Sequence, residues 1–127
     1  MWESKFAKEG LTFDDPIEVS KKMVEELKDK TDVIIALAHI GLDESSVVTS
    51  KQIAENVEGI DVIIDGHSHT LLTTGMLVNN TLIAQTGEHD KNLGYVNIEI
   101  KNGEVVGRTA ELLSVEAAAD TVADPDL

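Results

Sequence analysis

The 127-residue sequence contains no cysteine, only two prolines, four aromatic residues and few basic side chains. The lack of cysteine excludes disulfides, a thiolate nucleophile and a cysteine zinc site, so any metal would be held by histidine and carboxylate. Ten Lys and Arg stand against 24 Asp and Glu, which gives a net charge of −14. Because proteins that grip a phosphate backbone need clustered basic residues, nucleic-acid binding is disfavoured.

Long hydrophobic runs are also absent. The longest, such as 33–38, are far shorter than the roughly 20 residues that cross a bilayer, and no basic stretch followed by an apolar segment marks an export signal. The sequence therefore predicts no membrane span in this chain. Hydrophobic residues make up 42% and charged residues 27%, which is typical of a folded globular domain rather than of a disordered chain.

A helix is predicted over about residues 16–29. Asp14 or Asp15 can cap its N-terminus, and Pro16 suits its first position. Apolar residues recur at helical spacing along one face of this segment, while charged residues occupy the other face. The pattern indicates a helix that packs on a core through one side only.

Two continuous apolar runs, 32–38 and 60–64, predict strands of a parallel sheet that is covered on both faces. Between them a short helix is predicted to begin at Thr49 or Ser50 and to end near Gly59. This order of strand, helix and strand is a βαβ unit.

From about residue 76 the pattern changes to short segments separated by turn residues. The predicted segments are 76–78, 81–86, 94–100 and 104–114, and Asn102-Gly103 is a strong hairpin signal. We therefore predict an α/β fold in which the βαβ unit is followed by an antiparallel meander. After Arg108 no basic residue occurs, so 116–127 is predicted to be an acidic linker or tail and 1–115 the folded part.

Three of the four histidines, His39, His67 and His69, follow the two predicted strands. The carboxyl ends of neighbouring parallel strands meet at one edge of a sheet, where ligand sites form, so these imidazoles are expected in one crevice. In an extended segment His67 and His69 would project to the same side and reach one metal or two adjacent metals. Gly41 and Gly66 would allow the backbone to approach closely there. The alternative, that these histidines are ordinary hydrogen-bonded loop residues, stays open.

Four motifs carry a resemblance to a known family. They are the segments 11–19, Leu-Thr-Phe-Asp-Asp-Pro-Ile-Glu-Val; 32–41, Asp-Val-Ile-Ile-Ala-Leu-Ala-His-Ile-Gly; 59–70, which contains Gly-His-Ser-His-Thr; and 81–88, followed by Leu93-Gly94. In this order they resemble the calcineurin-like metallophosphoesterase domain of the bacterial 5′-nucleotidase and cyclic-nucleotide phosphodiesterase family. The likeness covers about residues 11–114.

The resemblance implies a two-metal centre in which His39 and His67 bind one metal and His69 binds the second. Zinc or manganese is the expected metal, and such a pair clamps a phosphate ester and activates a water for attack on phosphorus. Asp65 is expected to bind backbone groups or to orient a ligand rather than to bind metal. The resemblance also implies that His89 is a surface residue.

Other elements of that family are not found in these 127 residues. The family's Asp-x-His, Gly-Asp and Gly-Asn-His-Asp/Glu elements, which supply a bridging aspartate and a catalytic histidine, do not occur, nor does its nucleoside-binding domain. The resemblance therefore reaches the second half of the catalytic domain of a four-layer α/β/β/α sandwich. It assigns neither a catalytic nor a cofactor-binding residue to this chain beyond the metal ligands.

The expected function is therefore part of a metal-dependent phosphoesterase that hydrolyses nucleotides, with no activity in this chain alone. The resemblance implies an exported or cell-surface protein. Two alternatives remain, a non-catalytic α/β binding or interaction module and one subunit of a split enzyme. Because the chain would supply only part of the sandwich, an open sheet surface is expected to drive formation of a homo-oligomer.

Overall fold

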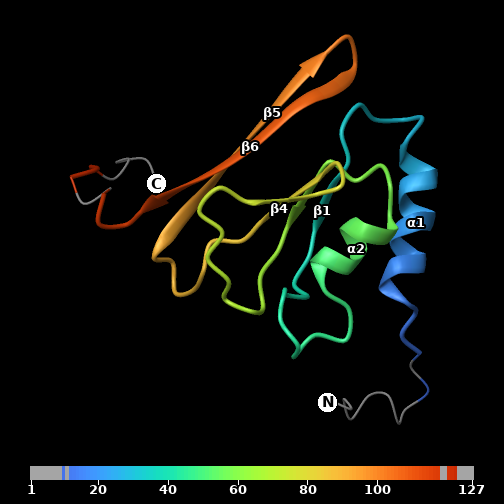
Figure 1. Cartoon of the computed structure of the whole chain (residues 1–127), viewed down its shortest axis with the longest axis horizontal. Coiled ribbons are helices and arrows are strands. Elements are labelled where there is room, and N and C mark those ends of the chain that lie inside the picture. Colours follow the sequence, from blue (N-terminus) through green and yellow to red (C-terminus); the bar gives the residue numbers. More distant parts are fainter. Residues whose placement is uncertain (1–9, 11, 118–119, 123–127) are drawn as a thin grey trace.

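The computed structural model describes residues 10, 12–117 and 120–122. Figure 1 shows how the elements formed by these residues are arranged. In chain order they are α1 (Pro16–Leu27), β1 (Ile35–Leu37), α2 (Ser50–Asn56), β2 (Val62–Ile64), β3 (Met76–Val78), β4 (Thr81–Ala84), β5 (Asn92–Lys101) and β6 (Glu104–Ser114).

Both helices begin where their capping residues predict. The Asp15 carboxylate accepts hydrogen bonds from the backbone N–H groups of Ile17 and Glu18, and Pro16 occupies the first helical position. Thr49 and Gln52 form a reciprocal capping box at the start of α2. Each cap pairs N–H groups that have no partner inside the helix, which fixes the first turn.

The central sheet has the strand order β1-β2-β4-β3. Strand β2 pairs in parallel with β1, Ile35 lying opposite Val62, and α2 connects them, so the βαβ unit is confirmed. The predicted antiparallel pairing is present between β3 and β4 and between β5 and β6. In addition, β4 pairs in parallel with β2, so β3 and β4 extend the central sheet instead of forming one meander with β5 and β6.

Strands β5 and β6 form a separate two-stranded sheet. Their connecting residues Asn102 and Gly103 have φ values of 55° and 81°, as a two-residue hairpin turn with the favoured twist requires. The hairpin predicted from this Asn-Gly pair is thus confirmed.

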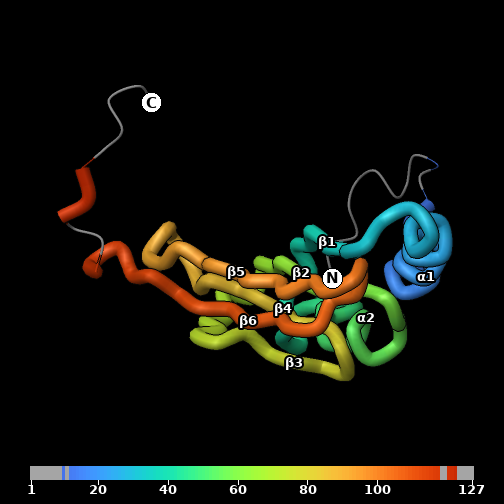
Figure 2. The backbone as a smooth tube through the Cα atoms, turned by 90° about the horizontal axis from the view of Figure 1, so that it is seen from above, coloured from blue at the N-terminus to red at the C-terminus, as the bar shows by residue number. Residues whose placement is uncertain are grey.

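Two apolar clusters hold together three layers, which are the helices, the central sheet and the β5–β6 hairpin. On one face of the central sheet, Ile63 and Ile83 pack against Ile53, Ala54 and Val57 of the α2 region. On the other face, a second cluster joins the sheet to the hairpin through Val62, Leu82 and Ala110. Because successive residues of a strand point to opposite faces, β2 and β4 contribute to both clusters. Figures 1 and 2 show the β5–β6 hairpin crossing the sheet and the helices grouped away from it.

The prediction that the first strand is covered on both faces is wrong. Strand β1 lies at the sheet edge, and Ala36 packs against the helix-side cluster. Its neighbours Ile35 and Leu37 are 54% and 86% exposed. They point to the other face, where the residues that pack on the sheet from the hairpin reach only β2 and β4.

An ion pair fastens the hairpin to the central sheet. Arg108 of β6 donates from Nη2 to Asp61 Oδ1 over 2.5 Å, and the two side chains are only 17% and 15% exposed. The other Asp61 oxygen accepts from the Ile34 backbone N–H over 2.9 Å. One carboxylate thus binds the segments before β1 and β2 to the outer layer.

The predicted boundary near residue 115 stays a prediction. Residues 115–117 lead into a turn after β6, and part of the predicted 116–127 tail lies outside the described residues. In the part of the chain that the structure covers, neither helix has the length and hydrophobicity needed to cross a membrane.

Candidate metal centre

Two of the predicted ligands lie side by side beyond the central strands. His39 follows β1 and His67 follows β2, and the Ala38 N–H continues the strand pairing by donating to the Ile64 carbonyl over 2.9 Å. The ring centroids of His39 and His67 are 5.4 Å apart and the ring planes are nearly perpendicular, at 79°. Both residues are exposed. The parallel pairing of β1 and β2 therefore brings these two imidazoles together as predicted.

Each of these rings lies against the glycine of the opposite loop. A Cβ added to Gly66 would come within 3.0 Å of His39 Nδ1, and one added to Gly41 would lie 3.2 Å from His67 Cδ2. Any larger residue at either position would push a ring away. The predicted role of the two glycines in close approach is confirmed.

Asp65 joins the two loops through its carboxylate. It accepts hydrogen bonds from the N–H groups of Ile40 at 2.9 Å, Gly41 at 3.0 Å and Gly66 at 2.8 Å, and it is 9% exposed. Burial acts to raise its pKa, but the hydrogen bonds from Ile40, Ser50, Gly66 and Gly41 together outweigh burial and hold the pKa below its usual range. The carboxylate is therefore ionised at neutral pH, and the predicted backbone-binding role is confirmed.

A buried amide supports the loop that carries His67 and His69. Gln85, at 2% exposure, follows β4 and accepts from Ser68 Oγ at 3.0 Å and from the Thr70 N–H at 2.5 Å. Ser68 Oγ in turn accepts from the Leu42 N–H at 3.1 Å. Sequence reasoning missed this network. Its one visible signal was a polar residue placed directly after the apolar run of β4.

The loop after β2 is not extended. His67 and His69 have φ values of 77° and 54°, in the left-handed region that side chains rarely adopt. The expectation that their side chains project to one side of an extended segment is therefore wrong. The hydrogen bonds of Ser68 and Thr70 to Gln85 hold the backbone in this conformation.

His69 lies instead beside an acidic residue of the loop after β4. Its Nδ1 is 2.9 Å from Glu88 Oε2, and His89 Nε2 is 3.5 Å from the same oxygen. Lys91 donates to Glu88 Oε1, and this contact is the largest of the effects that lower the pKa of Glu88. His89 is itself 72% exposed, as expected of a surface residue.

The three predicted ligands are thus divided into a pair and a single residue. No group of three or more His, Asp or Glu side chains within the described residues is arranged to hold one metal ion. His39 and His67 are in contact, whereas His69 pairs with Glu88. The resemblance assigns the same pair to one metal and the single histidine to another, and the structure leaves that assignment a prediction.

The centroid spacing of the pair is compatible with binding to one metal ion. Two imidazoles that bind a tetrahedral metal at about 2.0–2.1 Å have ring centroids roughly 5 Å apart, close to the 5.4 Å between His39 and His67. The pair also borders an open cavity of about 950 Å³. The other lining residues are Pro16, Ile40, Glu44, Ser45, Ser46, Val47 and Val48.

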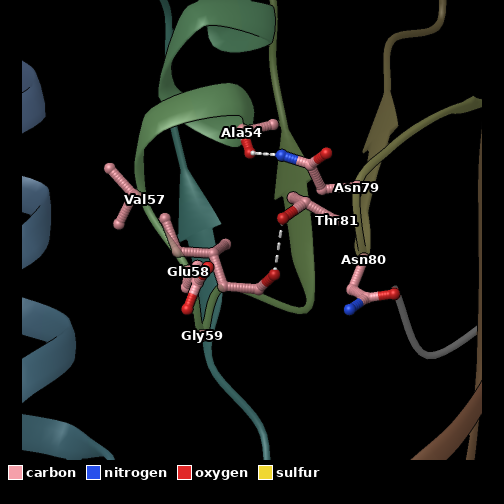
Figure 3. A pocket seen from close by; sticks show the side chains of 8 residues that line it. Ala54, Val57, Glu58, Gly59, Asn79, Asn80 and Thr81 are labelled. Carbon is pink, nitrogen blue, oxygen red and sulfur yellow. Dashed lines mark hydrogen bonds between the residues drawn. The ribbon is translucent and has the colours of Figure 1, made fainter.

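A second cavity, of about 630 Å³, lies at the other end of the strands (Figure 3). It is bordered by the segments that precede β2 and β4 and by the end of α2. Its polar groups bind backbone: Asn79 Nδ2 donates to the Ala54 carbonyl over 3.2 Å, and Thr81 Oγ1 donates to the Ile60 carbonyl over 2.8 Å. No histidine lines this cavity, and its hydrogen bonds serve packing.

Comparison with curated proteins finds phosphoesterases. The chain is 34% identical over 95 residues to an uncharacterized metallophosphoesterase, YunD, and 35% identical over 111 residues to a trifunctional nucleotide phosphoesterase protein, YfkN, both of Bacillus subtilis (strain 168). A 5′-nucleotidase of Diplobatis ommata is 32% identical over 117 residues. These alignments cover 75%, 84% and 77% of the chain but only 20%, 7% and 19% of the relatives.

The solved structures agree with the sequence relatives. The crystal structure of calcineurin-like phosphoesterase YfkN from Bacillus subtilis superposes with a TM-score of 0.64 at 25% identity. The match covers 94% of this chain and 42% of that chain. No protein-family model matches the chain. The chain thus spans about a fifth or less of the length of these curated relatives.

Proposed function

Since the chain is part of a calcineurin-like metallophosphoesterase domain, we propose that it supplies metal ligands to a centre that hydrolyses phosphate esters of nucleotides. His39 and His67 bind one divalent metal, and His69 binds a second. The single observation that carries this proposal is the contact between the two imidazoles, each against the glycine of the opposite loop. Relatives named as nucleotide phosphoesterases and 5′-nucleotidases support the substrate class.

The chemistry of the donors favours particular metals. Neutral imidazole suits zinc and other late transition metals, and the carboxylate and water oxygens that commonly complete such a site also suit manganese. A divalent metal bound here would stabilise the negative charge on the phosphate oxygens and lower the pKa of a bound water. The chain's own residues hold the imidazoles: the glycines allow the approach, and Asp65 and Gln85 fix the two loops.

Calorimetric titration of the 127-residue chain with zinc and with manganese tests the ligand assignment. We expect His39→Ala, His67→Ala and His69→Ala each to weaken binding about tenfold or more, since loss of a ligand costs at least as much as loss of a group that orients one. His89→Ala is the matched control, because it removes an exposed imidazole near Glu88 and is expected to leave the affinity unchanged. Unchanged affinity in both His67→Ala and His69→Ala would contradict the assignment.

The same titration separates this proposal from an interaction module. A module that merely retains the shape of the loops predicts no histidine-dependent metal binding. The exposure of the His39 and His67 rings beside an open cavity supports the metal-binding hypothesis, because rings that served only packing would be hydrogen-bonded inside a core.

We further propose that these 127 residues alone do not hydrolyse phosphate esters. The resemblance assigns the bridging carboxylate and the catalytic histidine to elements absent from this sequence, and loss of one transition-state contact typically costs about a hundredfold in rate. Phosphate release from a nucleoside monophosphate and a bis-aryl phosphodiester, with zinc or manganese, is expected at background. Turnover that His67→Ala abolishes would contradict this expectation.

A split enzyme is the alternative in which another polypeptide supplies the remaining elements. Mixing the chain with a separately made polypeptide that carries those elements should then restore turnover. A gene for such a polypeptide beside the one for this chain would favour the split arrangement. The parent protein, whether one chain or two, is predicted to be exported or displayed at the cell surface.

The uncovered face of β1 supports a proposal about assembly. Ile35 and Leu37 are exposed on a strand that pairs on one side only. An edge strand with apolar side chains is a ready template for another strand. We therefore propose that the isolated chain forms homo-oligomers through this surface.

A further inference from the structure

Among the residues that the structure describes, Asp65 is the acidic residue whose carboxylate accepts hydrogen bonds from both histidine loops. Oxygen Oδ1 accepts from the Ile40 N–H at 2.9 Å and from the Gly66 N–H at 2.8 Å, and Oδ2 accepts from the Gly41 N–H at 3.0 Å. Ile40 adjoins His39, and Gly66 adjoins His67. A single side chain therefore ties together the backbone segments that carry the two imidazoles.

These contacts pair groups that the sheet leaves without strand partners. Strand β1 ends at Leu37, so the N–H groups of Ile40 and Gly41 lie beyond the parallel ladder. Gly41 also has a φ of 81°, a conformation that continued strand pairing would not maintain. A buried N–H group without an acceptor destabilises the conformation that buries it. The carboxylate is thus what favours this particular arrangement of the loop over others.

A second aspartate near the two imidazoles, Asp43, is placed differently. Asp43 is exposed and accepts from the N–H and Oγ of Ser45, two residues along the same loop. It lies close enough to His67 and His69 to interact electrostatically with both, but its hydrogen bonds to Ser45 stay within its own loop. Asp43 and Asp65 carry the same charge near the same imidazoles, and only Asp65 spans the loops.

From this contrast we propose that Asp65 is a positioning residue: it fixes His39 relative to His67 and thereby sets the affinity of the pair for a divalent metal. The proposal rests on the proposed function, since it concerns the same imidazoles. Asp65 does not itself bind the metal, because its oxygens already accept from the N–H groups of Ile40, Gly41 and Gly66 and from the Ser50 side chain, and the residue is only 9% exposed.

Three substitutions distinguish an effect of Asp65 on the placement of the imidazoles from an effect of its charge and from a general loss of stability. Asp65→Asn keeps the shape but replaces an acceptor oxygen by a donor NH₂ facing a backbone N–H. Asp43→Asn removes the same charge without touching the contacts between loops. Thr81→Val deletes a buried hydroxyl bond to the Ile60 carbonyl at the opposite end of the sheet, and so lowers stability at a distance from the histidines.

The first measurement is zinc and manganese affinity by calorimetry. We expect Asp65→Asn to weaken binding about 10- to 100-fold, the usual effect of losing a group that orients a ligand. Asp43→Asn and Thr81→Val are expected to change the affinity by less than about threefold, because neither changes the placement of the pair. Equal affinities for wild type and Asp65→Asn would overturn the proposal, as would an equal loss in Thr81→Val.

The second measurement needs no metal and keeps the proposal testable if the proposed function fails. Nuclear Overhauser contacts between the His39 and His67 ring protons are expected in the metal-free wild type, whose ring centroids are 5.4 Å apart, and are expected to vanish in Asp65→Asn. If wild type binds neither metal, the metal assignment falls, and these contacts alone decide the positioning role. Their persistence in a folded Asp65→Asn chain would overturn it.

A third measurement covers the case in which Asp65→Asn does not fold. In the wild type, the amide protons of Ile40 and Gly41 should exchange at least about tenfold more slowly than that of the 92% exposed Val47, after correction for neighbouring residues. Slow exchange at both amides supports the carboxylate bonds. Exchange as fast as at Val47 would show that Asp65 does not hold the loop.

Discussion

Two aspartates flank strand β2, and each accepts hydrogen bonds from backbone N–H groups of neighbouring segments. One of them joins two layers of the fold, and the other holds the loops of the candidate site. Asp61 precedes the strand and accepts from the Ile34 N–H and from Arg108 of the hairpin. Asp65 follows the strand and accepts backbone N–H groups from the two histidine loops. Asp61 binds the backbone before β1, and Asp65 binds the backbone after it. Of the two carboxylates, only that of Asp61 pairs with an arginine.

The comparison shows how one short strand can serve stability at one end and a site at the other. At the amino end, an arginine from another layer pairs with the carboxylate, and the result is a link between layers. At the carboxyl end, backbone N–H groups satisfy the carboxylate, so the imidazoles of His39 and His67 remain exposed and unpaired with it. A site needs fixed backbone and free side chains, and this arrangement provides both.

Removal of the cation at the amino end should have the largest effect on folding. Arg108→Ala leaves Asp61 about five-sixths buried without its partner, and we expect a loss of about 2–4 kcal/mol in the free energy of unfolding. Urea denaturation measures it. Lys21→Ala, which removes an exposed pair with Glu18, is the control and should cost less than about 0.5 kcal/mol.

Two outcomes would contradict this account of the two ends of β2. A cost below about 1 kcal/mol would show that the ion pair does not hold the hairpin layer. A fall in metal affinity as large as that caused by Asp65→Asn would show that the two ends of β2 are not independent.

Two glycines with the same positive φ sharpen the comparison at the carboxyl end. Gly41 and Gly103 both have φ of 81°, but a Cβ at Gly41 would lie 2.9 Å from Ser46 Oγ and 3.2 Å from His67 Cδ2, whereas at Gly103 the nearest atom is 3.4 Å away. Each alanine substitution carries a conformational cost of about 1–2 kcal/mol. We expect Gly41→Ala to cost about 1 kcal/mol more because of the contacts.

The metal affinity separates the two glycine variants further. Only Gly41→Ala pushes on the His67 ring, so only this variant should weaken zinc binding. Denaturation curves and calorimetry on both proteins measure the two effects. An equal metal affinity in the two variants would mean that the close approach of ring and glycine is not needed by the site.

Local signals predicted the elements well, and the tertiary pairings less well. The caps at Asp15 and Thr49 and the turn at Asn102-Gly103 act within a few residues, so the sequence displays them directly. The parallel pairing of β4 with β2 depends on contacts between segments far apart in the chain. The alternation of short strands and turns after residue 76 contains nothing that distinguishes a partner in the central sheet from a neighbour along the chain.

The candidate site shows the same division. The placement of His39 and His67 follows from the rule that parallel strands end at one edge. The left-handed backbone at His67 and His69 could not be predicted, because non-glycine residues rarely adopt it and the bonds that maintain it come from Gln85, in another strand connection. Sequence alone therefore placed the pair of imidazoles but missed the contact of His69 with Glu88.

A buried hydroxyl, that of Thr81, and a half-buried one, that of Ser68, allow a comparison with smaller expected effects. Thr81 donates to the Ile60 carbonyl at the amino end of the strands, and Ser68 bonds the Leu42 N–H and Gln85 at the carboxyl end. Thr81→Val and Ser68→Ala should each cost about 1–2 kcal/mol of unfolding free energy, since each leaves a backbone group without its partner. Only Ser68→Ala should weaken metal binding. A similar affinity loss in Thr81→Val would contradict the division of labour between the ends.

The smallest effect on folding is expected at Leu37, on the uncovered face of β1. This side chain is 86% exposed, so Leu37→Lys should change the free energy of unfolding by less than about 0.5 kcal/mol. Its effect should fall on association instead, because a charged residue on an edge strand disfavours pairing with a second strand. Light scattering at high protein concentration is expected to give oligomers for wild type and a mass near 13.7 kDa for the variant.

The net charge of −14 opposes self-association, so the light scattering should be measured at about 0.15 M salt or above, where this repulsion is screened beyond roughly 8 Å. Val47→Lys, at a 92% exposed position outside the strands, adds the same charge without changing the edge and should leave the wild-type mass. A strictly monomeric wild type, or equal dissociation in Val47→Lys, would show that the open edge of β1 does not associate.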